Sequence, residues 1–244
     1  MKIKLLGKNL DTIRPILTDL GFEECEKDFE LVITYGGDGA LLGAERSYPQ
    51  LPKFPLRDAD TALPCPLHDA AERLKSFLSG REETSFLDKV AARCHGKEFV
   101  ALNDIFIHNF DRGSALRYRV RIDGELYARE IVGDSVGIAS IHGSSAYYRS
   151  ITHSLFRVGF GLAFSNSTEE VNHLVLSPGS KVEIEIVRGP GLLVYDNSNQ
   201  VETIQVGETV ELFMAESKAQ VIGLKGFMCR NCRMLRHPHK YPFS

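Results

Sequence analysis

The feature that most constrains the fold is the turn Gly36-Gly37-Asp38-Gly39, which directly follows an apolar, β-prone run over residues 29–35. An earlier strand is expected over residues 1–6, followed by a helix that starts late because Pro15 is tolerated only in a first turn. Another helix is expected after the turn, through residues 41–44. This order of strands and helices is typical of a parallel α/β sheet. Ligands of such sheets bind at the carboxyl ends of the strands, where this turn lies.

The composition of the turn favours phosphate binding. Glycines let backbone N–H groups approach phosphate oxygens with no Cβ in the way, and a following helix adds its positive N-terminal end. A carboxylate inside such a turn would repel phosphate. Asp38 is therefore interpreted as a base that takes a proton from a hydroxyl, or as a group that helps to hold Mg²⁺. The alternative is a tight turn with a helix-capping aspartate.

The rest of the chain predicts a change of architecture. Residues 47–66 hold five prolines and are expected to be mostly loop, and an amphipathic helix is expected over residues 67–78. From residue 99 onward, apolar and charged residues alternate and Asp123-Gly124 predicts a hairpin turn. The fold class expected is therefore α/β plus β, with an N-terminal Rossmann-like α/β domain and a C-terminal β-rich, sandwich-like domain. The predicted ranges are 1–97 for the first domain, 98–224 for the second, and 225–244 for a tail that packs back on the first.

Two segments of the second domain carry polar groups where a strand is expected to be buried. Asn103 and Asp104 interrupt an apolar run over residues 99–107, and two adjacent residues cannot both point away from the core of a regular strand. A bound ligand could supply the partner that a buried polar group requires; the alternative is a turn at a strand end. Residues 133–147 form a Gly/Ser-rich turn that could hold phosphate, ribose or an amide, although Ser145 could equally be a helix N-cap.

Together these segments resemble the NAD kinase family. Gly36-Gly37-Asp38-Gly39 with Ala40-Leu41-Leu42 is similar to the family's GGDG(T)LL signature, and Asn103-Asp104 is similar to its Asn-Glu pair. The segment from Asp134 to Tyr147 is similar to the family's aspartate followed by S-T-P-T-G-S-T-A-Y. The three matches occur in the family order. The resemblance implies the two-domain fold described above, with NAD bound between the domains.

The resemblance implies phosphorylation of the adenosine ribose 2′-hydroxyl of NAD, with ATP as phosphate donor and Mg²⁺; polyphosphate is an alternative donor in this family. Asp38 corresponds to the catalytic aspartate. Asn103 and Asp104 correspond to the adenosine-binding pair, and Asp134 to an aspartate near the nicotinamide. The remaining residues expected to bind the substrates are Gly36, Gly37, Gly39, His142, Ser145, Ala146, Tyr147 and Ser150. A homo-oligomer, dimer or tetramer, is implied in the same way.

The chain departs from the family pattern at three places. The family's T-P-T-G-S-T reads Ser140-Ile141-His142-Gly143-Ser144-Ser145, and Asp104 is one methylene shorter than glutamate. The family's Asn/His-x-Gly-x-Leu-Gly-Phe segment has no counterpart; residues 53–64 stand in its place. These departures leave two alternatives open, namely a different acceptor such as a lipid hydroxyl, and an NAD- or ATP-binding protein without catalysis. His142 itself could contact phosphate or act as an acid or base, or simply fill the place of the threonine.

Two weaker signals lead to no assigned site. Cys229-x2-Cys232 followed by His237 and His239 has residue types that zinc binds, but the His-x-His spacing is shorter than usual. Lys225-Gly226-Phe227 resembles the end of family members and favours a tail that packs back on the first domain, so no metal ligand is assigned. A hydrolase nucleophile is disfavoured because Gly143-Ser144-Ser145-Ala146-Tyr147 lacks the second glycine of G-x-S-x-G.

The composition restricts the expected binding partners and the expected cellular location of the protein. A net charge of −3 and a pI of about 6.3 argue against a nucleic-acid partner, and no run approaches the ~20 apolar residues of a membrane span. The start of the chain lacks the charged and apolar regions of a signal peptide. The five cysteines are odd in number and scattered, which is typical of reduced thiols. A cytoplasmic protein whose partners are the small molecules NAD and ATP is expected.

Overall fold

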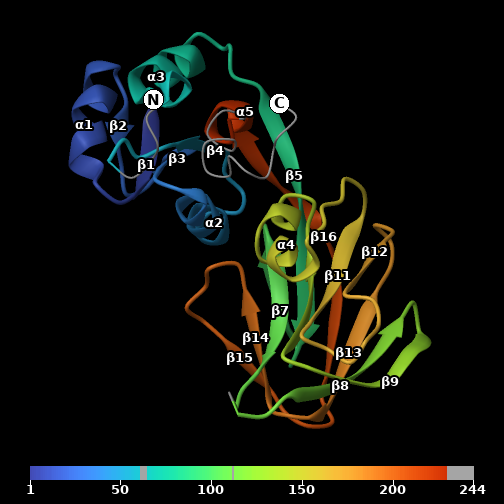
Figure 1. The fold of residues 1–244 in the computed structure, drawn as a ribbon. Helices are drawn as coiled ribbons and strands as arrows, with labels where there is room; N and C mark the ends of the chain where they lie inside the picture. The colour runs from blue at the N-terminus through green and yellow to red at the C-terminus, as the bar shows by residue number, and fades with distance from the viewer. Residues whose placement is uncertain (61–64, 112, 230–244) are drawn as a thin grey trace. The chain divides into compact units, whose positions relative to one another are not determined.

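The computed structural model describes residues 1–60, 65–111 and 113–229 of the chain (Figure 1). Its contacts divide the chain into two compact units, one formed by Met1–Phe86 together with the segment from Ala219 onward, and the other by Leu87–Lys218. The chain passes from the first unit to the second within strand β5 (Thr84–Cys94) and returns within strand β16 (Thr209–Ile222). The domain boundaries expected at residues 97 and 224 stay predictions.

The first unit is a parallel sheet with helices. Its strands lie in the order β2-β1-β3-β4-β16, and the neighbours that pair in this part of the sheet run parallel. Strands β5 and β16 run through both units. The elements that lie wholly in the first unit are β1 (Lys2–Gly7), α1 (Leu10–Asp19), β2 (Glu23–Glu24), β3 (Leu31–Tyr35), α2 (Asp38–Ser47), β4 (Lys53–Leu56), the 3-10 helix η1 (Pro66–His68), α3 (Ala70–Leu78) and α5 (Leu224–Phe227).

Helices cover both faces of this sheet. Helices α1 and α3 pack on one face through an apolar cluster that includes Ile13, Leu74 and, from β3, Leu31, Ile33 and Tyr35. Helix α2 contacts β1, β3 and β4 on the other face, and Figure 1 shows it on the opposite side of these strands from α1 and α3. All five residues of β3 are buried for this reason.

One sequence-based expectation for this unit was wrong, and one strand was not expected. Helix α1 begins at Leu10 and contains Pro15, although the proline was expected to delay its start. The described part of residues 47–66 is mostly loop, as expected, but α2 extends to Ser47 and the short strand β4 occupies residues 53–56. On either side of Pro55, the carbonyls of Pro52 and Leu56 accept from Val32 and Gly36, so β4 keeps its pairing with β3. The missing N–H of Pro55 points to the other side, where β16 pairs only at Lys53.

The second unit consists of two antiparallel sheets that share one apolar core. One sheet has the order β16-β13-β8-β9, with β5 paired to β16 and β6 to β5, and the other has the order β12-β11-β10-β7-β14-β15. The core contains Tyr118, Val120 and Ile184 of the first sheet and Ile105, Ile107 and Ile138 of the second. The remaining elements are β6 (Lys97–Ala101), β7 (Asp104–Asn109), β8 (Leu116–Ile122), β9 (Glu125–Gly133), β10 (Ser135–Ala139), η2 (Gly143–Ser145), α4 (Tyr147–Thr152), β11 (Phe160–Ser165), β12 (His173–Leu176), β13 (Val182–Arg188), β14 (Gly191–Tyr195) and β15 (Glu202–Ile204).

The predicted fold class, α/β plus a β-rich unit, is confirmed. In detail, the run over residues 99–107 is two strands rather than one, since β6 ends at Ala101 and β7 begins at Asp104. Residues 209–222 form the single long strand β16. Among the described helices, none combines the length and the apolar composition that crossing a bilayer requires. The tail from residue 230, with Cys232, His237 and His239, lies outside the described residues.

Candidate functional site

The glycine turn lies at the carboxyl end of β3, where α2 begins. Gly37 precedes the first helical residue, Asp38, and Gly39 lies in the first turn of the helix. Gly36 has φ +153°, in the range that favours glycine, and an added Cβ would come within 3.2 Å of the Cβ of Ala40. The N–H of Gly36 donates to the carbonyl of Leu56 at 2.9 Å. The turn is thereby fixed against β4, with the start of a ten-residue helix behind it.

A guanidinium lies beside the carboxylate of this turn. Asp38 is half exposed, and its Oδ1 accepts from Nη2 of Arg57 at 3.2 Å. Arg57 is only 8% exposed because its guanidinium lies 3.8 Å over the ring of Phe227, whose carbonyl accepts from Nε at 3.0 Å. Stacking and a directed hydrogen bond both hold the planar group in place. The turn therefore combines backbone N–H groups and a fixed positive charge, which suit anionic phosphates, with a carboxylate that can accept a proton.

In the second unit, a carboxylate organises the bend between β6 and β7. The backbone N–H groups of Leu102 and Asn103 donate to Asp196 at 2.9 and 2.7 Å. The bend is thus a strand-end turn, which was the alternative considered for Asn103-Asp104, and the protein itself supplies its backbone partner. The side chain of Asn103 is different, because its Oδ1 is buried and has no hydrogen-bond partner among the described residues. A buried acceptor of this kind has a free energy cost unless a donor reaches it.

The loop after β10 packs directly on this bend. The N–H of Ser140 donates to the carbonyl of Asn103 at 2.8 Å, and its Oγ donates to the carbonyl of Leu102 at 2.5 Å. A Cβ on Gly143 would lie 2.0 Å from the carbonyl oxygen of Asn103, so only glycine allows this approach. The structure thus brings the Asn103-Asp104 segment and the loop that contains His142 together.

The remaining residues of this group follow along η2 and α4. His142 is half-buried, and its carbonyl accepts from Oγ of the exposed Ser145 at 3.3 Å. Helix α4 begins at Tyr147 after Ala146, so Ser145 is not its N-cap. The exposed Tyr147 lies edge-on to Phe106 with 4.8 Å between ring centroids, and its carbonyl accepts from Oγ of Ser150 at 2.7 Å. Tyr147 therefore presents an aromatic surface beside β7.

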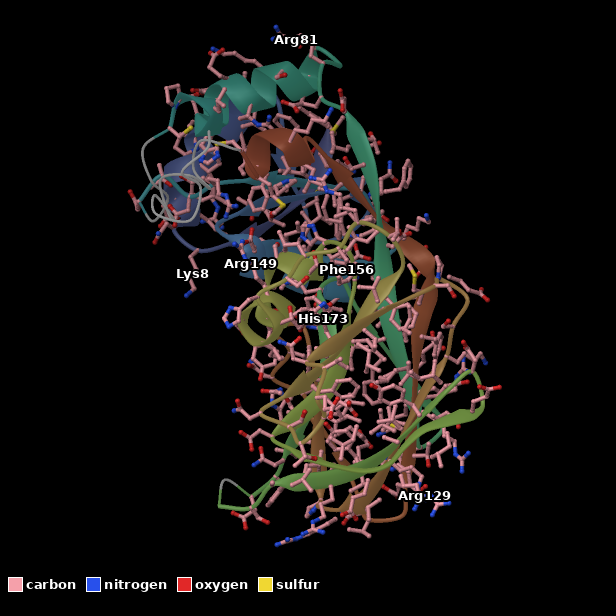
Figure 2. All side chains as sticks on the ribbon, turned by 45° about the vertical axis from the view of Figure 1, so that its right-hand side comes forward. Lys8, Arg81, Arg129, Arg149, Phe156 and His173 are labelled. Carbon is pink, nitrogen blue, oxygen red and sulfur yellow. The ribbon has the colours of Figure 1, made fainter. Side chains whose placement is uncertain are left out.

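Helix α4 is anchored to the sheet by aromatic packing. Tyr148 is buried, and its ring lies 5.1 Å from that of Phe156 and 5.7 Å from that of His173, centroid to centroid. Phe156 and His173 are labelled near this helix in Figure 2. The ring of His108 on β7 lies 5.6 Å from that of Tyr147, and burial lowers the pKa of His108. These contacts fix the helix that carries Tyr147 and Ser150.

Asp134 lies apart from this group. It precedes β10, whose first residue Ser135 pairs with His108, whereas Ala139 at the other end pairs with Asp104. The length of β10 therefore separates Asp134 from Asp104, roughly 17 Å at about 3.3 Å per residue. The carboxylate of Asp134 accepts from Nδ2 of Asn166 at 2.9 Å. The glycine turn belongs to the first unit, and all the other predicted residues belong to the second.

The carboxyl group of Asp104 has a raised pKa. Burial and the nearby charge of Asp196 raise its pKa from 3.8 to about 7. Below pH ~4 the group is protonated in both the folded and the unfolded chain. Between pH ~4 and ~7 the unfolded chain loses this proton while the folded protein keeps it. The contribution of Asp104 to the free energy of unfolding therefore falls as the pH rises through this window. Above pH ~7 the folded protein bears the full free energy cost of the buried, ionised carboxylate.

We expect Asp104→Asn to remove this dependence. The variant should be more stable than wild type at pH 8, with little difference at pH 4, because a neutral amide carries no charge to desolvate. Urea unfolding at both pH values measures the effect. Equal destabilisation at the two pH values would contradict the titration and indicate lost packing instead.

Comparisons with known proteins agree with the resemblance found in the sequence. No family model matches the chain. The NAD kinase of Saccharolobus islandicus is 30% identical over 165 residues, which cover 64% of this chain and 64% of that protein. The NAD kinase of Paracidovorax citrulli is 24% identical over 222 residues, 85% of this chain and 74% of the relative. The chain thus aligns with less than two thirds of the length of the Saccharolobus enzyme.

Solved structures share the fold over nearly the whole chain. An NAD kinase from Archaeoglobus fulgidus in complex with ATP superposes with a TM-score of 0.75 at 18% identity, covering 93% of this chain and 96% of that one. Yeast NADH kinase complexed with NADH gives a TM-score of 0.79 at 15% identity, covering 100% of this chain and 88% of that one. At these identities the likeness concerns the fold, and the two-unit architecture is the one that both structures have.

Proposed function

We propose that this chain, a divergent member of the NAD kinase family, transfers the γ-phosphoryl group of ATP to the adenosine ribose 2′-hydroxyl of NAD and so forms NADP. The observation that carries the proposal is the glycine turn at the end of β3, with Asp38 at the start of α2 and Arg57 fixed beside it. The relatives that align with the chain over most of its length are named for this activity.

Phosphoryl transfer requires positioning and charge stabilisation more than covalent chemistry. In our proposal, the backbone N–H groups of Gly37 and Gly39 bind phosphate oxygens, and Asp38 accepts the proton of the attacking hydroxyl. Gly36, whose N–H donates to the carbonyl of Leu56, lets the turn approach the phosphates without a Cβ in the way. The carboxylate is half exposed and so is accessible to a substrate. Arg57 stabilises negative charge on the phosphates, and its contact with Phe227 keeps it from swinging away.

Magnesium fits this turn. Mg²⁺ is usually bound through one or two carboxylates together with substrate phosphates, and the half-exposed carboxylate of Asp38 is such a ligand. When bound, the ion neutralises the charge of the phosphates. Arg57, which engages Oδ1 of Asp38, limits how the carboxylate can turn toward its ligands.

The acceptor nucleotide is proposed to bind through the second unit. The buried Oδ1 of Asn103 accepts a hydrogen bond from a ribose hydroxyl, which removes the cost of leaving this acceptor without a donor. Asp104, in its ionised form, accepts from a second hydroxyl. The ring of Tyr147 offers a face for a flat base, and His142, Ser145, Ala146 and Ser150 line the same loop and helix. For Asp134 we propose a contact near the nicotinamide, at the far end of β10.

The proton of Asp104 gives this assignment a testable signature. If the ionised carboxylate binds the hydroxyl, the KM for NAD should rise as the pH falls below about 7, the pKa of this group. Asp104→Asn should raise the KM at pH 8 and flatten its pH dependence, while the KM for ATP changes little. A KM for NAD that stays pH-dependent in the variant would assign the titration to another group.

The function itself is tested by incubating the purified protein with ATP, Mg²⁺ and NAD, and detecting NADP with a dehydrogenase that requires it. NADP formation supports the proposal. NAD binding without NADP would indicate a nucleotide-binding protein without catalysis. If neither occurs, a panel of other hydroxyl acceptors, lipids included, identifies the acceptor. Replacing ATP with polyphosphate in the same assay determines the donor.

A further inference from the structure

A cluster of metal-ligating side chains lies in the first unit, outside the proposed catalytic machinery. The Sγ atoms of Cys65 and Cys229 and a ring nitrogen of His68 all lie within 4.8 Å of one another. Cys229 is 5% exposed, and the other two residues are half-buried. From this geometry we propose that Cys65, His68 and Cys229 bind a structural zinc ion. The inference goes beyond the proposed kinase activity and does not depend on it.

The distances fit tetrahedral coordination. With Zn–S bonds of 2.3 Å and tetrahedral angles, two coordinating sulfurs lie about 3.8 Å apart. The Sγ atoms of Cys65 and Cys229 lie 3.7 Å apart. A disulfide would need about 2.05 Å, so the pair is not covalently joined. Two thiolates and an imidazole are the donor types that zinc prefers over hard cations such as Mg²⁺.

The local backbone presents these ligands together. The N–H of His68 donates to the carbonyl of Cys65 at 2.9 Å, which closes a 3-10 turn and places the ligands three residues apart on one side. Helix α5 contacts this turn and leads directly to Cys229. Both segments belong to the first unit, although 164 residues separate the two cysteines in the sequence.

The spacing of two of the ligands fits known zinc sites. Cys65 and His68 are separated by two residues, as in a common pair of zinc ligands. The described residues supply three of the four ligands that a closed structural zinc site uses. Cys229 joins this pair across 164 positions, so sequence spacing alone does not reveal the cluster.

The site has a structural consequence for the glycine turn. Phe227, two residues before Cys229, holds Arg57 through stacking and through its carbonyl, and Arg57 contacts Asp38. Zinc would fix the C-terminal segment to η1 and thereby keep Phe227 in place under Arg57. Loss of zinc should therefore lower the thermal stability of the protein and, through Arg57, its activity.

Metal analysis of the full-length protein, purified from zinc-containing medium without a metal-affinity tag, tests the proposal. One zinc per chain is expected. Cys65→Ser and Cys229→Ser should each reduce zinc to background. Cys25→Ser is the matched control, since Cys25 belongs to the first unit but not to the cluster, and it should retain one zinc. Retention of full zinc content by both Cys65→Ser and Cys229→Ser would overturn the assignment.

Two further measurements test the zinc site even if the cysteine variants fail to fold. His68→Cys keeps a zinc ligand at the position and should retain the metal, whereas His68→Ala should lose it. Cobalt added to the metal-free wild type should produce thiolate-to-metal charge-transfer absorption and restore the melting temperature. Absence of zinc together with absence of this band contradicts the proposal. A Cys65–Cys229 disulfide in the freshly purified protein, without metal, would equally contradict it.

Discussion

Replacing Asp38 with asparagine is expected to lower kcat by about 10²–10⁴-fold, the usual contribution of a positioned general base. The amide keeps the size of the side chain but cannot accept the proton of the 2′-hydroxyl. Asp38 is half exposed, and the amide oxygen of asparagine can still accept the hydrogen bond from Arg57. The melting temperature should therefore change little. Steady-state kinetics with ATP, Mg²⁺ and NAD, together with thermal unfolding, measure both effects.

Arg57→Lys is the companion variant for this result. Lysine keeps the charge but loses the planar group that stacks on Phe227 and donates from Nε to its carbonyl. A smaller loss of kcat is expected than for Asp38→Asn. If Asp38→Asn retained full activity while folded, Asp38 would not be the base, and the proposed mechanism would have to be abandoned.

Lys53→Met is expected to destabilise the first unit by about 3–5 kcal/mol, the cost of removing one partner of a buried ion pair. The ammonium of Lys53 on β4 pairs with the carboxylate of Glu45 on α2, and the side chains are 0% and 4% exposed. The pair lies between the sheet and the helix that begins with Asp38. Urea unfolding measures the loss.

The double variant Lys53→Met/Glu45→Leu separates charge from packing. Replacing both partners of a buried ion pair with apolar groups is often neutral or stabilising. The double variant should therefore recover most of the stability that Lys53→Met loses. A double variant as unstable as the single one would show that the shape of Lys53, rather than the charge left on Glu45, accounts for the loss.

The local patterns of the sequence predicted the elements that surround the glycine turn. Two short apolar runs predicted β1 and β3, and the glycine turn predicted the start of α2. These signals lie within a few neighbouring residues of the sequence. The proline rule was wrong at Pro15, and the proline-rich segment concealed the short strand β4. Pro15 lies inside α1, which packs through Ile13 and Leu17, and Pro55 lies in β4 on the side where pairing is sparse. In both places tertiary packing outweighed the local preference.

The contacts that build the site could not be predicted, because residues far apart in the sequence make them. Arg57 meets Phe227 across 170 positions, and Asp196 binds the Leu102-Asn103 bend across more than 90. Each of these residues is a single position outside any periodic pattern, so the sequence does not indicate its partner. The sequence indicates a possible strand-end bend at Asn103. It does not indicate that the carboxylate of Asp196 holds this bend, because Asp196 only follows β14 as one residue of a polar turn.

The position of the transferred phosphate tests the central claim most directly. The protein would be incubated with Mg²⁺, NAD and ATP labelled in the γ-phosphate, and the labelled product identified by nuclear magnetic resonance. We predict that the label is found on the 2′-oxygen of the adenosine ribose, and that 2′-deoxy-NAD accepts none. Label that appears only as inorganic phosphate, or that is transferred equally well to the deoxy analogue, would contradict the account.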